Sequence, residues 1–113
     1  MPLTIYHNPR CSKSRQTLDL LVAKGRKPTV VEYLKRPPSV AELTRIVAML
    51  GVQARDILRK AEAIDAGIHP DSMTEKELIA AMVRNPIVIE RPIVVNNGKA
   101  ALGRPPENVL KII

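Results

Sequence analysis

The chemistry available to this chain centres on its single cysteine, Cys11, which follows a short apolar stretch and precedes an amphipathic one. A free thiol has a pKa of about 8.5, and a helix N-terminus with nearby cations lowers it to roughly 3.5–7.5, which yields the nucleophilic thiolate. Arg10, Lys13 and Arg15 supply the cations. The alternative is a small buried side chain, a common fate of a free cysteine. The flanking residues favour a reactive thiol.

The positive charge of the chain is concentrated around this cysteine. The formal net charge is +7, and residues 1–36 contain eight Lys/Arg against two acidic residues, a net charge of +6. A small anion attracted to Cys11 explains this distribution best, and a generally solvated basic surface ranks second. Nucleic-acid binding ranks third because only two aromatic residues are present for base stacking and no nucleic-acid motif is found.

Length and composition limit the class of protein. A chain of 113 residues predicts one domain over residues 1–113, and the absence of Phe and Trp predicts an aliphatic core. We expect no membrane association because no apolar run has the length of a span, and no signal peptide is recognisable at the N-terminus. A lone cysteine cannot form an internal disulfide, which agrees with a reducing compartment. The expected location is therefore cytoplasmic.

The elements that must position Cys11 begin with a β–α–β pattern. Residues 3–6 predict a strand, residues 12–24 a helix that ends before Gly25, and residues 29–33 a second strand. Two strands joined through a helix pair in parallel. Cys11 then lies at the junction of the first strand and the helix.

The middle of the chain is predicted to be helical. Ser39 with Glu42, and Thr74 with Glu77, match the capping box that starts a helix. The first of these helices is predicted to end at Gly51 and the second at Asn85-Pro86. Between them, the sequence predicts a shorter helix over residues 54–60 and an irregular segment over residues 61–72.

The last third predicts a hairpin and a short helix. Asn97-Gly98 separates the apolar segments 92–96 and 99–102, and both turn positions accept positive φ. A last short helix extends through Ile112. The complete order predicts an α/β, thioredoxin-like fold with a mixed four-stranded sheet, βαβ then ββα, and a helical insertion between the halves.

Four separated motifs resemble the ArsC-type arsenate reductase family, the class that depends on glutathione and glutaredoxin. They are Tyr6-His7-Asn8-Pro9-Arg10-Cys11 with Ser14-Arg15, Leu58-Arg59-Lys60, Arg91-Pro92-Ile93-Val94-Val95 and Gly103-Arg104-Pro105-Pro106-Glu107. The resemblance covers residues 3–113. The best-known members carry Gly-Thr where this chain has Ser12-Lys13. This difference places the chain in a branch with a Cys-Ser-Lys-Ser loop and leaves the choice between arsenate and a related oxyanion open.

The resemblance assigns roles to particular residues. It implies that Cys11 attacks arsenate and that three arginines bind the oxyanion, namely Arg59, Arg91 and Arg104. Arginine suits this task because its planar fork donates paired, charge-assisted hydrogen bonds to such oxygens. Taken singly, each arginine fits a solvated side chain better than a ligand, and Arg59 also fits an ion pair to Glu62 or Asp56.

The resemblance also implies a supporting set around the thiolate. Ser14, one helical turn beyond Cys11, is placed to hydrogen-bond the sulfur, and His7 to hold the thiolate if charged or to act through the loop. Pro92 matches the cis-proline that thioredoxin-like folds place beside the active thiol. We expect no metal site because neither His7 nor His69 belongs to a cluster of metal ligands.

The solitude of Cys11 constrains the mechanism that the resemblance implies. After thiolate attack forms a thiol–arsenate adduct, reduction to arsenite requires a second thiol, and the chain contains none. The family uses glutathione as co-substrate and glutaredoxin to reduce the resulting mixed disulfide. No bound organic cofactor is expected.

Two alternatives from other functional classes remain open. The segment Cys11-Ser12-Lys13-Ser14 also resembles the Cys-x-x-Ser loop of monothiol glutaredoxins, which are thiol transferases or iron–sulfur carriers. A non-enzymatic alternative is an Spx-like regulator that binds RNA polymerase, a group with an ArsC-like fold. Its usual redox switch is a Cys-x-x-Cys pair, whereas this chain has Ser14 at the second position.

Overall fold

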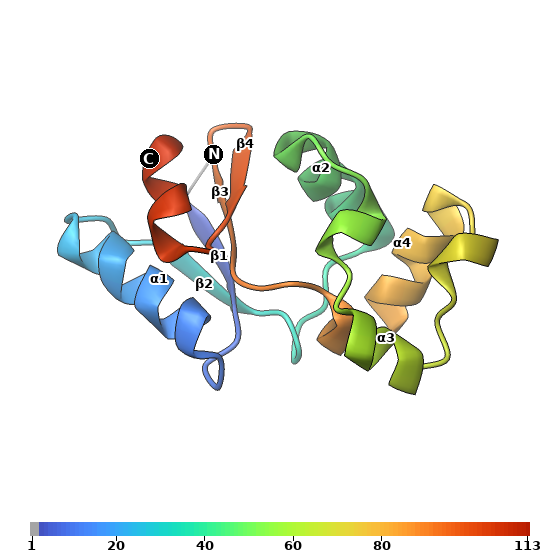
Figure 1. Cartoon of the computed structure of the whole chain (residues 1–113). Helices are drawn as coiled ribbons and strands as arrows, with labels where there is room; N and C mark the ends of the chain where they lie inside the picture. Colours follow the sequence, from blue (N-terminus) through green and yellow to red (C-terminus); the bar gives the residue numbers. More distant parts are fainter. Residues whose placement is uncertain (1–2) are drawn as a thin grey trace. The chain divides into compact units, whose positions relative to one another are not determined.

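Within residues 3–113, which this computed structural model describes, four strands form one mixed sheet in the order β2-β1-β3-β4 (Figure 1). They are β1 (Thr4–His7), β2 (Thr29–Glu32), β3 (Ile93–Asn96) and β4 (Lys99–Leu102). Strand β1 pairs in parallel with β2 and antiparallel with β3, and β3 pairs antiparallel with β4. The predicted thioredoxin-like α/β fold, with βαβ followed by ββα, is confirmed.

One face of the sheet is covered by two helices that lie far apart in the sequence. Helix α1 (Ser12–Ala23), blue in Figure 1, and the 3₁₀ helix η4 (Pro106–Lys111), red, cover this face together. Their shared core is aliphatic, as the composition predicts, and contains Leu3, Ile5, Leu21, Val94 and Val109. This packing holds α1 against the sheet through Leu21, and Cys11 immediately precedes the helix.

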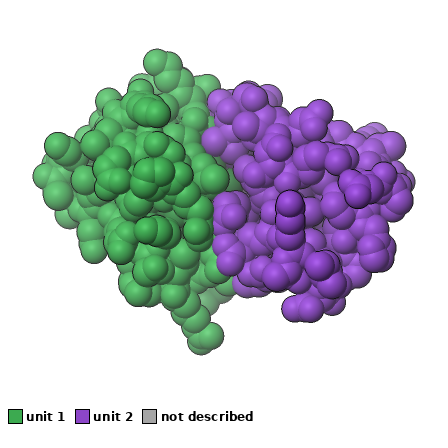
Figure 2. All heavy atoms as spheres, in the orientation of Figure 1, with its two compact units in different colours: residues 1–36, 91–113 green, residues 37–90 purple. Residues whose placement is uncertain are grey.

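The chain divides into two compact units (Figure 2). The sheet unit combines Met1–Arg36 with Arg91–Ile113, and the helical unit is the intervening segment Pro37–Glu90. The helical unit is the insertion that the sequence predicts between the halves of the sheet. The prediction of one domain over residues 1–113 stays a prediction, and its first two residues lie outside the described part.

The two longest helices of the helical unit start where their capping boxes predict. Ser39 and Thr74 each accept a hydrogen bond from the backbone N–H three residues later, at 3.1 Å in both cases. They cap α2 (Val40–Leu50) and α4 (Glu75–Arg84). Helix α2 ends at Gly51, whose φ of 71° is the left-handed conformation that glycine adopts without strain.

The segment between these helices differs from its prediction. The helix expected over residues 54–60 is a 3₁₀ turn, η1 (Ala54–Ile57), and part of the segment expected to be irregular forms α3 (Lys60–Asp65). The interruption has a long-range cause: Leu58 forms an antiparallel bridge with Ile89, and the Arg59 N–H donates to the Val88 carbonyl at 2.7 Å. This pairing holds residues 58–59 extended, which overrides their helical preference.

The hairpin and the C-terminal helix follow the predicted pattern. Asn97 (φ 51°) and Gly98 (φ 76°) form the turn between β3 and β4. The last helix, η4, is a 3₁₀ helix. Two further 3₁₀ turns, η2 (Pro70–Ser72) and η3 (Pro86–Val88), flank α4. Among the helices of residues 3–113, none combines the length and apolar character needed to cross a membrane.

Candidate active site

Cys11 is the N-cap of α1 and lies in a loop that hydrogen bonds hold in place. Its N–H donates to the Asn8 carbonyl and its carbonyl accepts from the Arg15 N–H, both at 3.0 Å. The Asn8 side chain accepts a further bond from the Arg10 N–H at 3.0 Å. The thiol is partly exposed. The loop therefore presents the sulfur at the start of the helix, within reach of solutes.

The surroundings of Cys11 favour the thiolate. Burial acts to raise the pKa of the thiol, but hydrogen bonds from the backbone N–H groups of Ser14 and Lys13, together with the charged Arg91 side chain, outweigh it and lower the pKa. These N–H groups belong to the first turn of α1, where they have no acceptor within the helix. The helix start and a guanidinium thus stabilise the negative sulfur, as the sequence predicts for this position.

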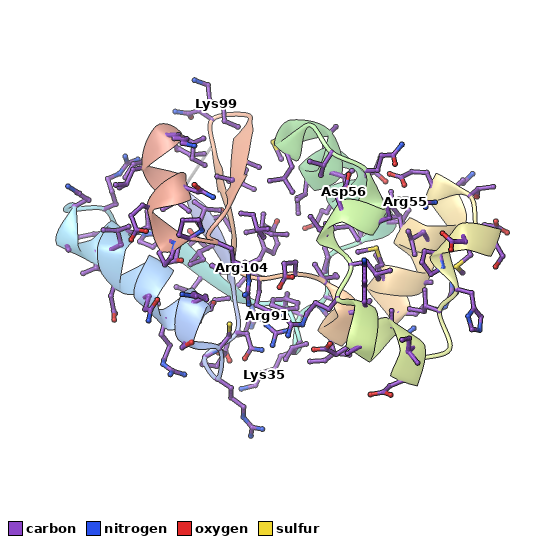
Figure 3. All side chains as sticks on the ribbon, viewed as in Figure 1. Lys35, Arg55, Asp56, Arg91, Lys99 and Arg104 are labelled. Carbon is purple, nitrogen blue, oxygen red and sulfur yellow. The ribbon has the colours of Figure 1, made fainter. Side chains whose placement is uncertain are left out.

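Two of the three predicted arginines lie beside this sulfur. The Arg104 Nη2 atom is 3.5 Å from Cys11 Sγ, and its Nε donates to the Arg91 carbonyl at 2.7 Å. Both arginines come from the sheet unit, one before β3 and one after β4 (Figure 3). The peptide bonds Arg91–Pro92 and Arg104–Pro105 are both cis, which confirms the expectation for Pro92. The fold therefore brings Cys11, Arg91 and Arg104 together from three segments.

The backbone beside Arg104 requires a glycine for steric reasons. A Cβ atom on Gly103 would lie 2.5 Å from Thr17 Oγ1 and 2.7 Å from Pro92 Cγ. Thr17 is fully buried in α1, and the Gly103 N–H donates to the Pro92 carbonyl at 2.9 Å. The close approach of Gly103, which follows β4, to Thr17 of α1 sets the position from which Arg104 reaches the sulfur.

Gly103→Ala is expected to lower the free energy of unfolding by about 1–3 kcal/mol, because the added methyl group overpacks a rigid, buried contact. Urea denaturation measures this change. The control is Gln16→Ala, an exposed substitution on α1, the helix that Gly103 contacts through Thr17. It is expected to change the free energy of unfolding by at most about 0.5 kcal/mol. Equal stability of Gly103→Ala and the native chain would contradict the close packing.

A buried polar cluster of His7, Asn8 and Ser14 supports the loop that carries Cys11, which we call the thiol loop. His7 Nδ1 lies 2.7 Å from the Ser14 hydroxyl oxygen, which also accepts the Asn8 N–H at 3.0 Å. The hydroxyl of Ser14 thus bonds the loop, and it is the backbone N–H of Ser14 that bonds the sulfur. Burial lowers the pKa of His7 and outweighs the attraction of Glu32, so the imidazole is neutral at neutral pH. His7 thus contacts the loop through the Ser14 hydroxyl, and a role of His7 in supporting the thiolate stays a prediction.

The lowered pKa of His7 predicts a pH dependence of stability. The unfolded chain takes up a proton near the ordinary value of 6.5, while the folded chain does so only at lower pH. Folding stability is therefore fully present above this value and falls as the pH is lowered below it. We expect the urea midpoint to decrease between about pH 7 and about pH 5.5, and to decrease less in His7→Gln. Parallel pH profiles of the two proteins would contradict a buried neutral His7.

Arg59, the third predicted arginine, lies in the helical unit. Its Nε contacts Glu62 at 2.7 Å and its Nη1 contacts Glu90 at 2.6 Å. Burial opposes the charged form, but the two carboxylates hold the pKa of Arg59 above its ordinary value. The ion pair with Glu62 is one of the alternatives that the sequence offers. A role of Arg59 in oxyanion binding stays a prediction.

Sequence reasoning overlooked two residues that shape this site. Asn8 is buried and bonds three backbone or side-chain groups of the thiol loop. The pair Asn8-Pro9 is a sequence signal for a turn, which indicates a turn just before Cys11. Asn108 donates to the Arg104 carbonyl at 3.0 Å, and no local sequence signal identifies it.

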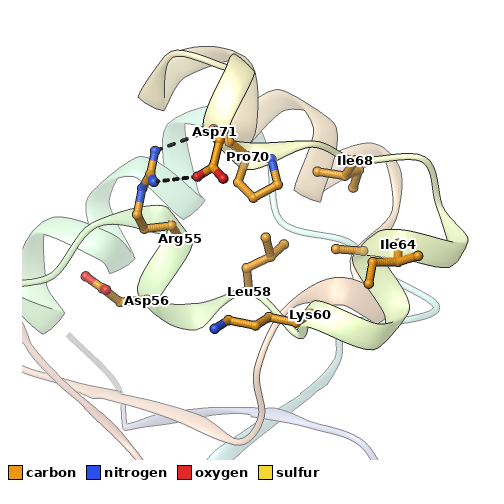
Figure 4. Close-up of a pocket in the computed structure, with 9 residues that line it drawn as sticks. Arg55, Asp56, Leu58, Lys60, Ile64, Ile68, Pro70 and Asp71 are labelled. Atoms are coloured by element: carbon orange, nitrogen blue, oxygen red, sulfur yellow. Dashed lines mark hydrogen bonds and ion pairs between the residues drawn. The ribbon is translucent and has the colours of Figure 1, made fainter.

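A cavity of about 670 Å³ lies in the helical unit (Figure 4). Leu58, Ile64 and Ile68 supply apolar lining, and Arg55 and Asp71, which also line it, contact each other at 3.4 Å. Among the residues that the structure describes, its lining includes none of the predicted site residues. The cavity therefore adds nothing to the site at Cys11.

The chain is similar to known proteins over nearly its whole length. The ArsC family model matches residues 6–112. The chain is 51% identical over 112 residues to the Escherichia coli (strain K12) protein named uncharacterized protein YfgD, covering 96% of this chain and 94% of YfgD. It is 43% identical over 116 residues to the arsenate reductase of Haemophilus influenzae, covering 100% of both chains. The solved arsenate reductase of Vibrio cholerae matches with a TM-score of 0.90 and 46% identity, over 100% of this chain and 98% of that chain.

Proposed function

Since the chain belongs to the ArsC family, we propose that it reduces arsenate to arsenite, with the Cys11 thiolate as nucleophile. The observation that carries the proposal is the cluster of Cys11, Arg91 and Arg104 at the start of α1. A thiolate surrounded by hydrogen-bond donors suits a small tetrahedral oxyanion. The relatives named arsenate reductase identify arsenate as the first candidate.

The groups around the sulfur match the demands of arsenate binding. Arsenate carries several negative oxygens, and arginine forks bind such oxygens through paired, charge-assisted hydrogen bonds. Backbone N–H groups at the start of the 12-residue helix α1 add donors for an anion. Thiolate attack on arsenic, with loss of one oxygen as water, forms a covalent sulfur–arsenic bond. Arg91 and Arg104 offset the negative charge on the remaining oxygens.

The electrons must come from two thiols, of which the chain holds one. Reduction of As(V) to As(III) takes two electrons, and joining two thiols in a disulfide releases two. Cys11 provides one sulfur, and we propose that glutathione provides the other, so that arsenite leaves and a Cys11–glutathione disulfide remains. Glutaredoxin then restores the thiolate. This route uses no metal and no bound organic cofactor, and its thiol donors place it in a reducing compartment such as the cytoplasm.

The supporting residues have distinct proposed roles. Ser14 supplies its backbone N–H to the thiolate and, through its hydroxyl, ties the loop to neutral His7.

Arg59 is proposed as a third oxyanion ligand on the basis of the family motif. Because Glu62 and Glu90 already bind its guanidinium, this role requires the oxyanion to compete with two carboxylates. A raised arsenate KM in Arg59→Lys supports the role, and an unchanged KM contradicts it.

A coupled assay tests the proposed function. Purified chain is mixed with glutathione, glutaredoxin, glutathione reductase and NADPH, and NADPH oxidation is followed after arsenate is added. We expect oxidation that requires arsenate, the chain and glutathione together. A flat trace, with coupling enzymes shown to be active on a control disulfide, would contradict arsenate reduction.

A further inference from the structure

We propose that the exposed cations beside Cys11 form a docking surface for an acidic protein that carries its own thiol, the glutaredoxin of the proposed cycle. We name Arg10, Lys13 and Arg15 the thiol-loop cations. The inference rests on the proposed function, because a thiol donor is needed only if Cys11 ends each turnover in a mixed disulfide. It goes further in naming the surface that recognises the donor.

The positive charge of the chain belongs to the sheet unit. Residues 1–36 and 91–113 contain 12 Lys/Arg and three Asp/Glu, a net charge of +9, whereas residues 37–90 contain six and eight, a net charge of −2. A protein that approaches Cys11 therefore meets the strongly basic unit. Such a field accelerates association with an acidic partner and slows association with a basic one.

The thiol-loop cations are available to a partner. All three side chains are exposed, whereas Cys11 between them is partly buried. Other cations are paired, such as Lys35 with Glu32 and Arg55 with Asp71. Within residues 3–113, by contrast, no carboxylate lies within 4.0 Å of a thiol-loop cation. In the described part of the chain, these three cations therefore form no direct ion pair.

The position of these cations suits a macromolecular partner. Arg10 precedes Cys11 and Lys13 follows it by two residues, so the cations flank the sulfur on both sides along the chain. Arg15 is anchored to the same loop, since its Nη1 donates to the Pro9 carbonyl at 2.9 Å. Arg91 and Arg104 already lie at the sulfur, where the proposed function assigns them to the oxyanion. A protein that brings its sulfur to Cys11 must cover the loop, and acidic residues around that sulfur would contact the cations.

The step that this docking serves is a thiol–disulfide exchange. The glutaredoxin thiolate attacks the glutathione sulfur of the Cys11–glutathione disulfide, a new sulfur–sulfur bond forms, and Cys11 leaves as a thiolate. Glutathione passes to glutaredoxin, and the number of disulfides is unchanged. The exchange involves no arsenate, so it can be measured by itself.

The test measures this exchange directly. The Cys11–glutathione disulfide is prepared by treating the full chain with glutathione disulfide, and a purified glutaredoxin of negative net charge then removes the glutathione. We expect Arg10→Glu with Lys13→Glu to lower the second-order rate constant about tenfold at low salt, and the difference to shrink at high salt. Arg10→Gln with Lys13→Gln is expected to give a smaller decrease.

The matched control places the same charge change at the other end of α1. Lys24→Glu with Lys27→Glu alters two exposed lysines: Lys24 is the C-cap of α1, about 18 Å along the helix axis from its start, and Lys27 lies in the loop that follows. This variant is expected to leave the rate within about twofold. Equal effects of the two double variants would overturn a local docking surface. A second result would also overturn it: Arg10→Glu with Lys13→Glu lowers the rate by the same factor when glutathione alone is the reductant. The cations would then act on the small glutathione anion and not on a protein partner. Either result leaves the proposed function intact, since failure of that function appears in the arsenate assay.

Discussion

Cys11→Ser is expected to abolish arsenate reduction while the chain stays folded. The hydroxyl that replaces the thiol does not ionise near neutral pH, and it cannot donate electrons by forming one half of a disulfide. Serine is also a favourable N-cap, so α1 is expected to keep its start. Arsenite formation, measured directly in the presence of glutathione and glutaredoxin, should fall by at least about 10³-fold.

The control for this prediction is Ser12→Ala, which changes the exposed neighbour of the thiol and keeps the sulfur. It is expected to retain activity within about threefold, because surface changes away from a specific contact have small effects. If Cys11→Ser kept a tenth or more of the native rate, the nucleophile would have to be another group.

Arg104→Lys is expected to lower kcat/KM for arsenate by about 10²-fold or more, although the positive charge is kept. Arg104 contacts the Arg91 carbonyl through Nε and the Cys11 sulfur through Nη2 at the same time. A lysine has one ammonium group at the end of a flexible chain and cannot reproduce this planar arrangement. Steady-state kinetics with varied arsenate measures the loss.

Arg36→Lys provides the comparison, because it makes the same chemical change at an exposed position. We expect its kcat/KM to match that of the native chain. An Arg104→Lys enzyme with nearly native kcat/KM would show that positive charge alone is sufficient at this position. It would contradict the claim that the planar guanidinium is required.

The features that the sequence predicts correctly are those that neighbouring residues determine. The capping residues Ser39 and Thr74 and the turn Asn97-Gly98 act within three or four positions, and each is found where the pattern places it. Cys11 belongs to the same class, because its helix start lies in the residues that follow it.

The features that sequence reasoning misses depend on residues far apart in the chain. Residues 58–59 are extended because they pair with residues 88–89, which no local pattern reveals. Gly103 is required by Thr17, 86 positions earlier. The charge state of His7 likewise depends on its burial in the folded chain. In each case the packing of distant segments decides the outcome, and periodicity and propensity describe only the segments themselves.

The central claim is that the helix start and Arg91 stabilise the thiolate of Cys11 and thereby lower the pKa of its thiol. The most direct test is the rate of Cys11 alkylation by iodoacetamide as a function of pH, followed by intact-mass spectrometry. The account predicts that the rate rises to its plateau with a midpoint clearly below the free-thiol value of about 8.5. A midpoint at or above that value would contradict an activated thiol and, with it, the proposed attack on the oxyanion.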